Sequence, residues 1–159
     1  RLRPRAALRA ETWAVAIVRR GSALLVRQRP PQGLLHDLVE LPTFEVGAGA
    51  ASAAASAEAL ARGLRDATGL RGVVGDELLL HRQVISNRKV VMRVFATTVA
   101  ASARPRPPAR FVEPAELNAE PITMATRKIA RQLAVGAKPS AAAARATAAA
   151  TSRIRPKKR

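Results

Sequence analysis

The stretch that decides the fold runs from Ser22 to Pro42 and reads Ser-Ala-Leu-Leu-Val-Arg-Gln-Arg-Pro-Pro-Gln-Gly-Leu-Leu-His-Asp-Leu-Val-Glu-Leu-Pro. Its short apolar run, Ala23 to Val26, predicts a buried strand. The Pro-Pro-Gln-Gly sequence at 30–33 interrupts this pattern, because proline cannot donate a hydrogen bond to a sheet and glycine permits positive φ. A second apolar segment at 34–41 follows and ends at Pro42, so a tight break separates two apolar segments.

Length and composition predict one domain with tails in this chain of 159 residues. The chain contains no cysteine, which excludes disulfides, cysteine-ligated zinc and iron–sulfur clusters within it and fits an intracellular protein. No apolar run approaches the length of about 18 residues that a membrane span needs. Because the chain starts at Arg1 and lacks a signal-peptide core, we expect further sequence upstream.

The positive charge is concentrated at both ends of the chain. The formal net charge is +17, of which residues 1–10 contribute +4 and residues 138–159 contribute +7, leaving +6 for the middle. Such a balance predicts a polyanionic partner, because Lys and Arg displace the counterions condensed on nucleic acids. A genome rich in G and C, whose codons favour Arg, Ala and Pro, explains the same composition equally well.

Strands and helices are not predicted to alternate strictly, which indicates an α+β architecture with a mixed sheet. The expected elements are strands at 13–18 and 23–27, a loop at 45–57, a helix at 58–68, strands at 73–80 (broken by Gly75-Asp76), 82–86, 89–99 and 111–112, a short helix at 113–117 and a final helix at 123–134. They place one domain at 11–135, between a basic arm at 1–10 and a basic, Ala-rich tail at 136–159 that we expect to be disordered.

The helix expected at 58–68 has the clearest local signals. Leu60 and Leu64 are four residues apart and therefore share one face. Ser56 is the expected N-cap and Gly69 the expected residue after the last turn. Leu70 is expected to pack back on the helix.

Three motifs follow one another in the first part of the chain: Ala23-Leu-Leu-Val-Arg-Gln-Arg-Pro, Gly33-Leu-Leu and Val39-Glu-Leu-Pro. In this order they resemble the Nudix family, and in particular the C-terminal domain of MutY-type adenine DNA glycosylases. The resemblance extends over residues 11–134. It implies a Nudix-like fold, with a mixed sheet flanked by helices, and it matches the arm at 1–10 to the linker that precedes this domain.

The catalytic signature of the family departs from its pattern in this chain. That signature, Gly-x5-Glu-x7-Arg-Glu-U-x-Glu-Glu-x-Gly-U with U aliphatic, uses several glutamates on one helix to hold Mg²⁺ against a pyrophosphate. Aligned on Gly69, its last three glutamates fall on Gly63, Asp66 and Ala67. Because one carboxylate cannot hold the metal, we expect no catalytic residue and no metal site in this chain.

The resemblance assigns lesion recognition to a hairpin near residue 87. Glycosylases of this type often carry Phe-Ser-His there, where this chain has Ile85-Ser86-Asn87. By this match Ile85 wedges against a base step, Ser86 and Asn87 hydrogen-bond 8-oxoguanine, and Arg88 and Lys89 lie over phosphates. Read without the match, Ser-Asn-Arg is an ordinary polar hairpin turn.

The resemblance thus implies the 8-oxoguanine-recognition domain of an adenine DNA glycosylase, a hydrolase of base excision repair that removes adenine opposite the oxidised base. Excision and any iron–sulfur cluster would belong to an upstream domain of the same polypeptide, so no cofactor is expected in this chain. The expected partner is double-stranded DNA with an oxidised guanine, bound by a monomer at the nucleoid in the bacterial cytoplasm. The alternatives are a Nudix hydrolase of a nucleoside diphosphate derivative and a non-catalytic, ribosome-associated binding protein.

Three other polar residues carry weaker signals. His36 and His81 lie far apart without neighbouring ligands, which argues against a zinc site. Glu40 is expected to pair with an arginine such as Arg27 or Arg29.

Overall fold

The computed structural model describes residues 6–135, so the tail predicted to be disordered lies outside the described residues. The chain divides into two compact units, the first ending at Thr126 and the second beginning at Arg127. Within the described range no helix is long and apolar enough to cross a membrane. The predicted domain limits at 11 and 135 stay predictions.

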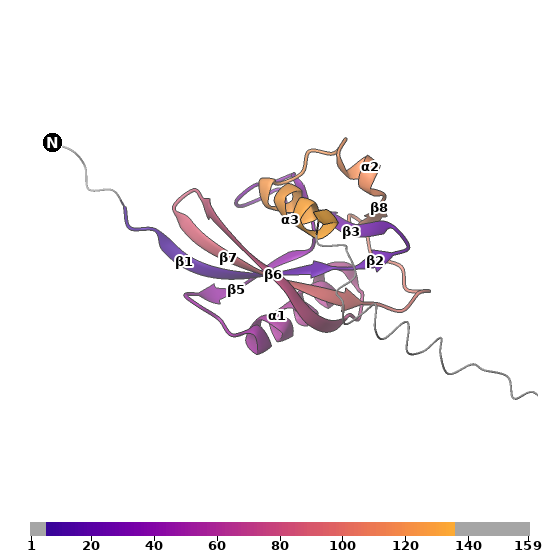
Figure 1. Cartoon of the computed structure of the whole chain (residues 1–159), viewed down its shortest axis with the longest axis horizontal. Helices are drawn as coiled ribbons and strands as arrows, with labels where there is room; N and C mark the ends of the chain where they lie inside the picture. The colour runs from indigo at the N-terminus through magenta and orange to yellow at the C-terminus, as the bar shows by residue number, and fades with distance from the viewer. Residues whose placement is uncertain (1–5, 136–159) are drawn as a thin grey trace, which may run out of the picture. The chain divides into compact units, whose positions relative to one another are not determined.

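The larger sheet is mixed, as the sequence predicted. Its strand order is β5 (Thr43–Ala48), β1 (Arg9–Ile17), β7 (Arg88–Thr98) and β6 (Val73–Ile85), shown in Figure 1. Strand β1 is parallel to β7 and antiparallel to β5, while β6 and β7 form an antiparallel hairpin. The buried, β-branched residues of β1 put it at the centre, because such side chains suit a strand covered on both faces.

Residues 22–42, which we call the decisive stretch, supply two strands of the second sheet. Strand β3 (Ala23–Gln28) pairs with β2 (Arg19–Arg20), β4 (Val39–Glu40) and β8 (Arg110–Val112), always antiparallel. Gly21, with φ +59°, allows the tight turn between β2 and β3. The predicted return strand at 23–27 and the short strand at 111–112 are both confirmed.

Helix α1 (Ala53–Thr68) is longer than the sequence predicted, and the loop expected at 45–57 is wrong. Residues 43–48 form β5 because their main chain pairs with β1, and the alanines at 53–57 extend the helix because alanine has the highest helix propensity. The N-cap is Ser52, whose Oγ accepts a hydrogen bond from the Ala55 amide at 3.1 Å. Ser56, the predicted cap, is instead buried inside the helix.

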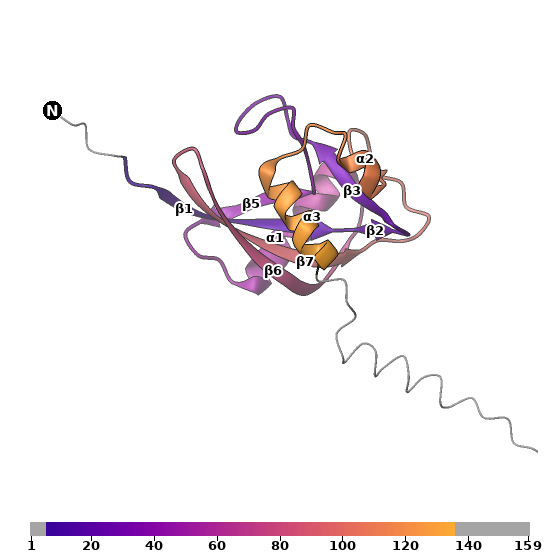
Figure 2. The same ribbon diagram turned by 45° about the horizontal axis from the view of Figure 1, so that its top comes forward.

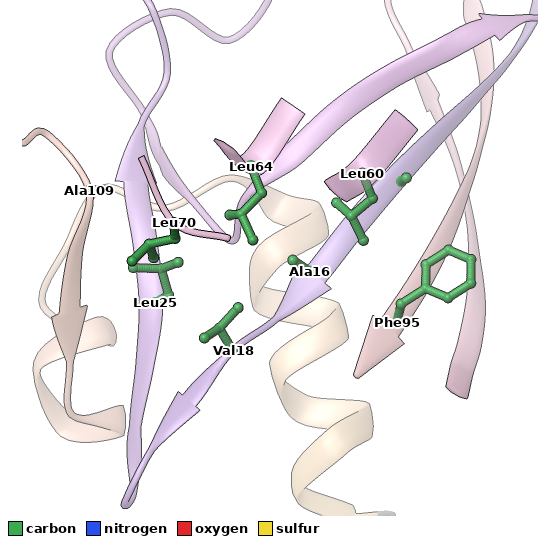
Figure 3. Close-up of a cluster of buried hydrophobic side chains, with 9 residues drawn as sticks. Ala16, Val18, Leu25, Leu60, Leu64, Leu70, Phe95 and Ala109 are labelled. Carbon is green, nitrogen blue, oxygen red and sulfur yellow. The ribbon is translucent and has the colours of Figure 1, made fainter. Parts of the chain in front are cut away.

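The core forms where α1 packs on β1 and β5. Leu60 and Leu64 both face the sheet, as predicted, and Figure 3 shows them among the buried apolar side chains. Gly69 ends the helix at φ +75°, and Leu70 packs into the same cluster. Small residues on β1 allow the helix to approach closely. The cluster consists of Ala14, Ala16, Val18, Leu25, Leu60, Leu64, Leu70, Phe95 and Ala109.

Strand β6 is one continuous strand, so the predicted break at Gly75-Asp76 and the boundary near His81 are wrong. Its pairing with β7 shifts register between Val74 and Glu77 and again between Glu77 and Leu79. These β-bulges absorb extra residues without ending the strand. The turn predicted at Ser86-Asn87-Arg88 is confirmed in place but is one residue shorter, because Ser86 and Asn87 connect the strands and Arg88 begins β7.

The last elements agree closely with the sequence. Helix α2 (Pro114–Leu117) has proline at its first position, and α3 (Met124–Val135) follows it. Thr123 caps α3, because its Oγ1 accepts a hydrogen bond from the Thr126 amide at 3.2 Å. Thr126 Oγ1 in turn accepts a hydrogen bond from the Leu41 amide at 3.1 Å, which joins the start of α3 to the end of the decisive stretch.

The two serines at the start of α1 should respond differently to alanine substitution. Ser52→Ala removes the cap and should lower the free energy of unfolding by about 1 kcal/mol. Ser56→Ala removes a buried hydroxyl that has no hydrogen-bond partner among the described residues, and should leave stability unchanged or raise it. Urea denaturation of both variants measures this. Equal losses in the two variants would contradict the assignment of the cap.

Candidate nucleic-acid interface

The tip of the β6–β7 hairpin exposes two of the predicted recognition residues. Ser86 and Asn87 are exposed, and Ser86 has φ +55°, which a tight turn requires. The Asn87 carbonyl accepts a hydrogen bond from the Arg9 amide at 2.9 Å, so the tip is bound to the start of β1. Figure 2 shows the hairpin beside β1. The backbone of the tip is therefore held against β1, while both side chains are open to solvent.

The other three predicted residues differ in their accessibility. Ile85 is 6% exposed, so the folded hairpin does not present it as a wedge. Arg88 Nη1 lies 3.2 Å from carboxylate oxygens of both Glu11 and Glu45, and its side chain is 28% exposed, so its charge is already compensated. Lys89 is exposed. A contact of Ser86, Asn87 or Lys89 with DNA stays a prediction.

Helix α1 offers little of the chemistry that a metal-dependent hydrolase needs. A Cβ atom at Gly63 would lie 2.6 Å from Cγ of Phe44, so an aromatic ring occupies the space beside this position. Asp66 is exposed and lies 4.0 Å from Arg65, and Ala67 carries no ligand. Over residues 6–135 no group of three or more His, Cys, Asp or Glu could hold a metal ion.

Behind Phe44 lies a buried charge cluster that we define as Arg27, Arg29 and Glu40. Glu40 Oε2 is 2.7 Å from Arg29 Nη1, and Glu40 Oε1 is 3.5 Å from Arg27 Nη2, so the predicted pairing is confirmed with both arginines. The Arg27 guanidinium lies over the Phe44 ring at 4.7 Å, and that of Arg29 over the Trp13 ring at 5.4 Å. These cation–π contacts add to the stabilisation of the two guanidinium groups, whose side chains are 15% and 13% exposed.

Burial shifts two ionisation equilibria in this cluster. It raises the pKa of the Glu40 carboxyl above its ordinary value, although the Arg29 and Arg27 guanidinium groups oppose the rise. Burial also lowers the pKa of Arg27, and the Glu40 carboxylate opposes that change. Arg27 Nε and Glu40 Oε1 have no hydrogen-bond partner among the described residues. The cluster is therefore strongly desolvated.

A continuous series of contacts links the buried charge cluster to the hairpin. Trp13 Nε1 donates a hydrogen bond to Glu11 Oε2 at 3.0 Å, and Arg88 binds the same oxygen. No local pattern indicated that Glu11, Trp13 and Phe44 take part in such a series, because most of their partners in it are distant along the chain. The series, in order, is Gly63, Phe44, Arg27, Glu40, Arg29, Trp13, Glu11 and Arg88.

The two histidines take no part in this series of contacts. His36 is exposed, and His81 is buried with its Nε2 at 3.0 Å from Gln83 Oε1.

Comparison with known proteins gives one family match and several similar folds. A family model described as the NUDIX domain matches residues 13–132. The MutT protein from Methanosarcina mazei Go1 has a TM-score of 0.67 and 19% identity, over 82% of this chain and 97% of that one. The E. coli ORF135 protein has a TM-score of 0.60 and 19% identity, over 86% and 99%.

A further similar structure comes from a eukaryotic protein. The C-terminal domain of mouse MUTYH, solved in complex with human PCNA, has a TM-score of 0.59 and 23% identity over 76% of this chain and 85% of that one. At such identities the likeness concerns the fold alone. No curated protein sequence matches the chain.

The contact between Gly63 and Phe44 can be tested by a double-mutant cycle. Gly63→Ala should lower the free energy of unfolding by about 1–3 kcal/mol because its methyl group clashes with the ring, although alanine favours a helix. In a Phe44→Ala background the same change should be neutral or stabilising. Guanidinium chloride denaturation of the four proteins measures the coupling. A loss of equal size in both backgrounds would show that the ring is not the obstacle.

Proposed function

Because the chain belongs to the NUDIX domain family, we propose that it is a non-catalytic member that recognises oxidised guanine in DNA as part of a MutY-type adenine DNA glycosylase. The observation that carries the proposal is the state of helix α1. Gly63, which aligns with a metal-binding glutamate, has the Phe44 ring against it, and Ala67 has no carboxylate. A NUDIX domain that lacks metal ligands at these two positions can still bind another molecule through its surface.

The exposed hairpin tip supplies the chemistry for reading the lesion. Guanine presents N7 as a hydrogen-bond acceptor in the major groove, whereas oxidation at C8 places a hydrogen on N7 and makes it a donor. Ser86 Oγ and Asn87 Oδ1 can both accept a hydrogen bond. An acceptor at the tip therefore favours the oxidised base, because a buried donor or acceptor left without a partner costs about 1–3 kcal/mol.

The rest of the proposal concerns the larger protein. Adenine excision, and any iron–sulfur cluster, would belong to another domain, which would receive the adenine after it is flipped from the duplex. The partner is double-stranded DNA with an oxidised guanine, bound by a monomer at the nucleoid of the bacterial cytoplasm. Support for this branch of the family comes from the motifs of residues 23–42 and from the fold shared with the C-terminal domain of mouse MUTYH.

A nucleotide hydrolase is the second candidate, favoured by the fold shared with the MutT protein of Methanosarcina mazei Go1. It predicts turnover of a nucleoside diphosphate derivative with Mg²⁺ that EDTA abolishes. We expect no such turnover, because α1 carries a single carboxylate at the three aligned positions.

Duplex binding tests the main proposal. Fluorescence anisotropy should give tighter binding of a duplex with 8-oxoguanine opposite adenine than of the same duplex with guanine, by about 10-fold or more. Ser86→Ala/Asn87→Ala should bring this ratio close to one. Ser102→Ala/Asn118→Ala, which changes the same residue types at exposed positions away from the hairpin, should preserve it.

Two results would contradict the proposal. One is equal affinity of the unaltered protein for both duplexes. The other is a ratio that survives substitution of Ser86 and Asn87. A structured RNA that competes as well as the lesion duplex would favour the ribosome-associated alternative.

A further inference from the structure

A groove of about 400 Å³ lies beside the hairpin, between β6, β7, β1 and the loop after β5. The sheet register arranges four of its residues as a square, with Arg82 opposite Val91 and Val84 opposite Lys89. Alternation along β7 puts Lys89 and Val91 on the same face as Phe95, whose side chain packs with α1 in the core. The groove is therefore the uncovered end of the sheet face that α1 covers elsewhere.

The walls of the groove are fixed by hydrogen bonds. Ala10 lies beside Lys89 in the sheet, and its small side chain leaves the floor open. The Gly49 amide donates to the Ala10 carbonyl at 2.7 Å, Thr12 Oγ1 donates to the Gly49 carbonyl at 2.7 Å, and the Ala51 amide donates to Thr12 Oγ1 at 3.0 Å. The loop at 49–51 is thus held against β1, so a ligand meets a preformed site.

The cations of the groove are uncompensated within the described part of the chain. Arg82 and Lys89 are exposed, and neither forms an ion pair there. By contrast, Arg93, which follows Val91 on this face of β7, forms an ion pair in which its Nη1 lies 2.7 Å from Glu77 Oε2. Arg82 and Lys89 are diagonal neighbours across two strands, about 7–8 Å apart at the backbone. Two like charges at this spacing favour an anion between them.

The acidic residue that lines the groove does not cancel this charge. Glu11 follows Ala10 in β1, so its side chain points to the opposite face of the sheet. There its carboxylate binds Arg88 and Trp13. The groove therefore combines two free cations with an aliphatic floor.

We propose that this groove binds one nucleotide of a single-stranded nucleic acid, with its phosphodiester between Arg82 and Lys89 and its unstacked base on Ala10, Val84 and Val91. Proteins that bind single strands without sequence preference combine a cationic groove with side chains on which the bases lie, usually aromatic ones. In this groove aliphatic side chains take that place. An acidic peptide would supply the charge but no flat apolar body for the floor. The inference rests on the nucleic-acid-binding part of the proposed function, and it is independent of lesion recognition by Ser86 and Asn87.

Fluorescence anisotropy with a labelled twelve-residue oligo-dT, using the full chain, tests the cationic rim. Arg82→Gln/Lys89→Gln should weaken binding about tenfold. It should also reduce the slope of log affinity against log salt concentration by about 0.7, the loss of one phosphate contact on a single strand. The control Arg71→Gln/Arg104→Gln removes the same charge at exposed positions outside the groove and should change affinity much less.

A second probe tests the floor. The unaltered protein should prefer oligo-dT to an abasic strand of equal length by about fivefold or more, because the abasic strand has no base to stack. Ala10→Ile fills the floor without changing charge and should abolish this preference with little change in the salt slope. Circular dichroism confirms that each variant is folded.

Three results would overturn the inference. The first is equal affinity of Arg82→Gln/Lys89→Gln and Arg71→Gln/Arg104→Gln for oligo-dT. The second is no preference of the unaltered protein for oligo-dT over the abasic strand. The third is displacement of the labelled oligo-dT by polyglutamate of equal charge as effectively as by unlabelled oligo-dT. Measuring the lesion-duplex ratio on the same proteins separates the two proposals. If the ratio is absent while the groove variants behave as expected, recognition of oxidised guanine fails and the groove inference stands.

Discussion

The contact between the Phe44 ring and the bare backbone of α1 at Gly63 constrains much of the structure. A Cβ atom there would lie 2.6 Å from the ring, so only glycine lets the helix approach β5 this closely. The same ring carries the Arg27 guanidinium on its face at 4.7 Å. Gly63, which aligns with a metal-binding glutamate, therefore serves the packing of α1 on Phe44. The positively charged Arg27 side chain lies against the same ring.

The buried charge cluster fixes the position of one sheet on the other, for an energetic reason. Taking three charges out of water is costly, and their mutual attraction offsets this cost only if the geometry is well defined. Arg27 and Glu40 are paired residues of β3 and β4, while Arg29 reaches Trp13 of the other sheet. The cluster thus fixes the two sheets to each other, and through Glu11 and Arg88 it extends to the hairpin whose tip we propose to bind DNA.

Local patterns predicted the elements whose signals are short-range. Leu60 and Leu64 marked the buried face of α1, Gly69 its end, and Ser86-Asn87 the hairpin turn. The same patterns failed where Ala and Gly dominate. Residues 45–48 have little strand propensity, and only pairing with β1 makes them a strand. Ser56 looked like a cap because the alanines before it carry no periodic signal.

The sequence by itself determined the family, the two apolar segments on either side of the break at residues 30–33 and the loss of carboxylates from α1, because these depend on residue identity and spacing. Only the tertiary structure decided which side chains of the hairpin are accessible. Strand alternation leaves two opposite assignments of buried and exposed faces, and packing chose the one that buries Ile85 and exposes Arg82, Val84 and Lys89. The cationic groove arises from that choice, since its residues come from three strands and a loop that meet only in the folded chain.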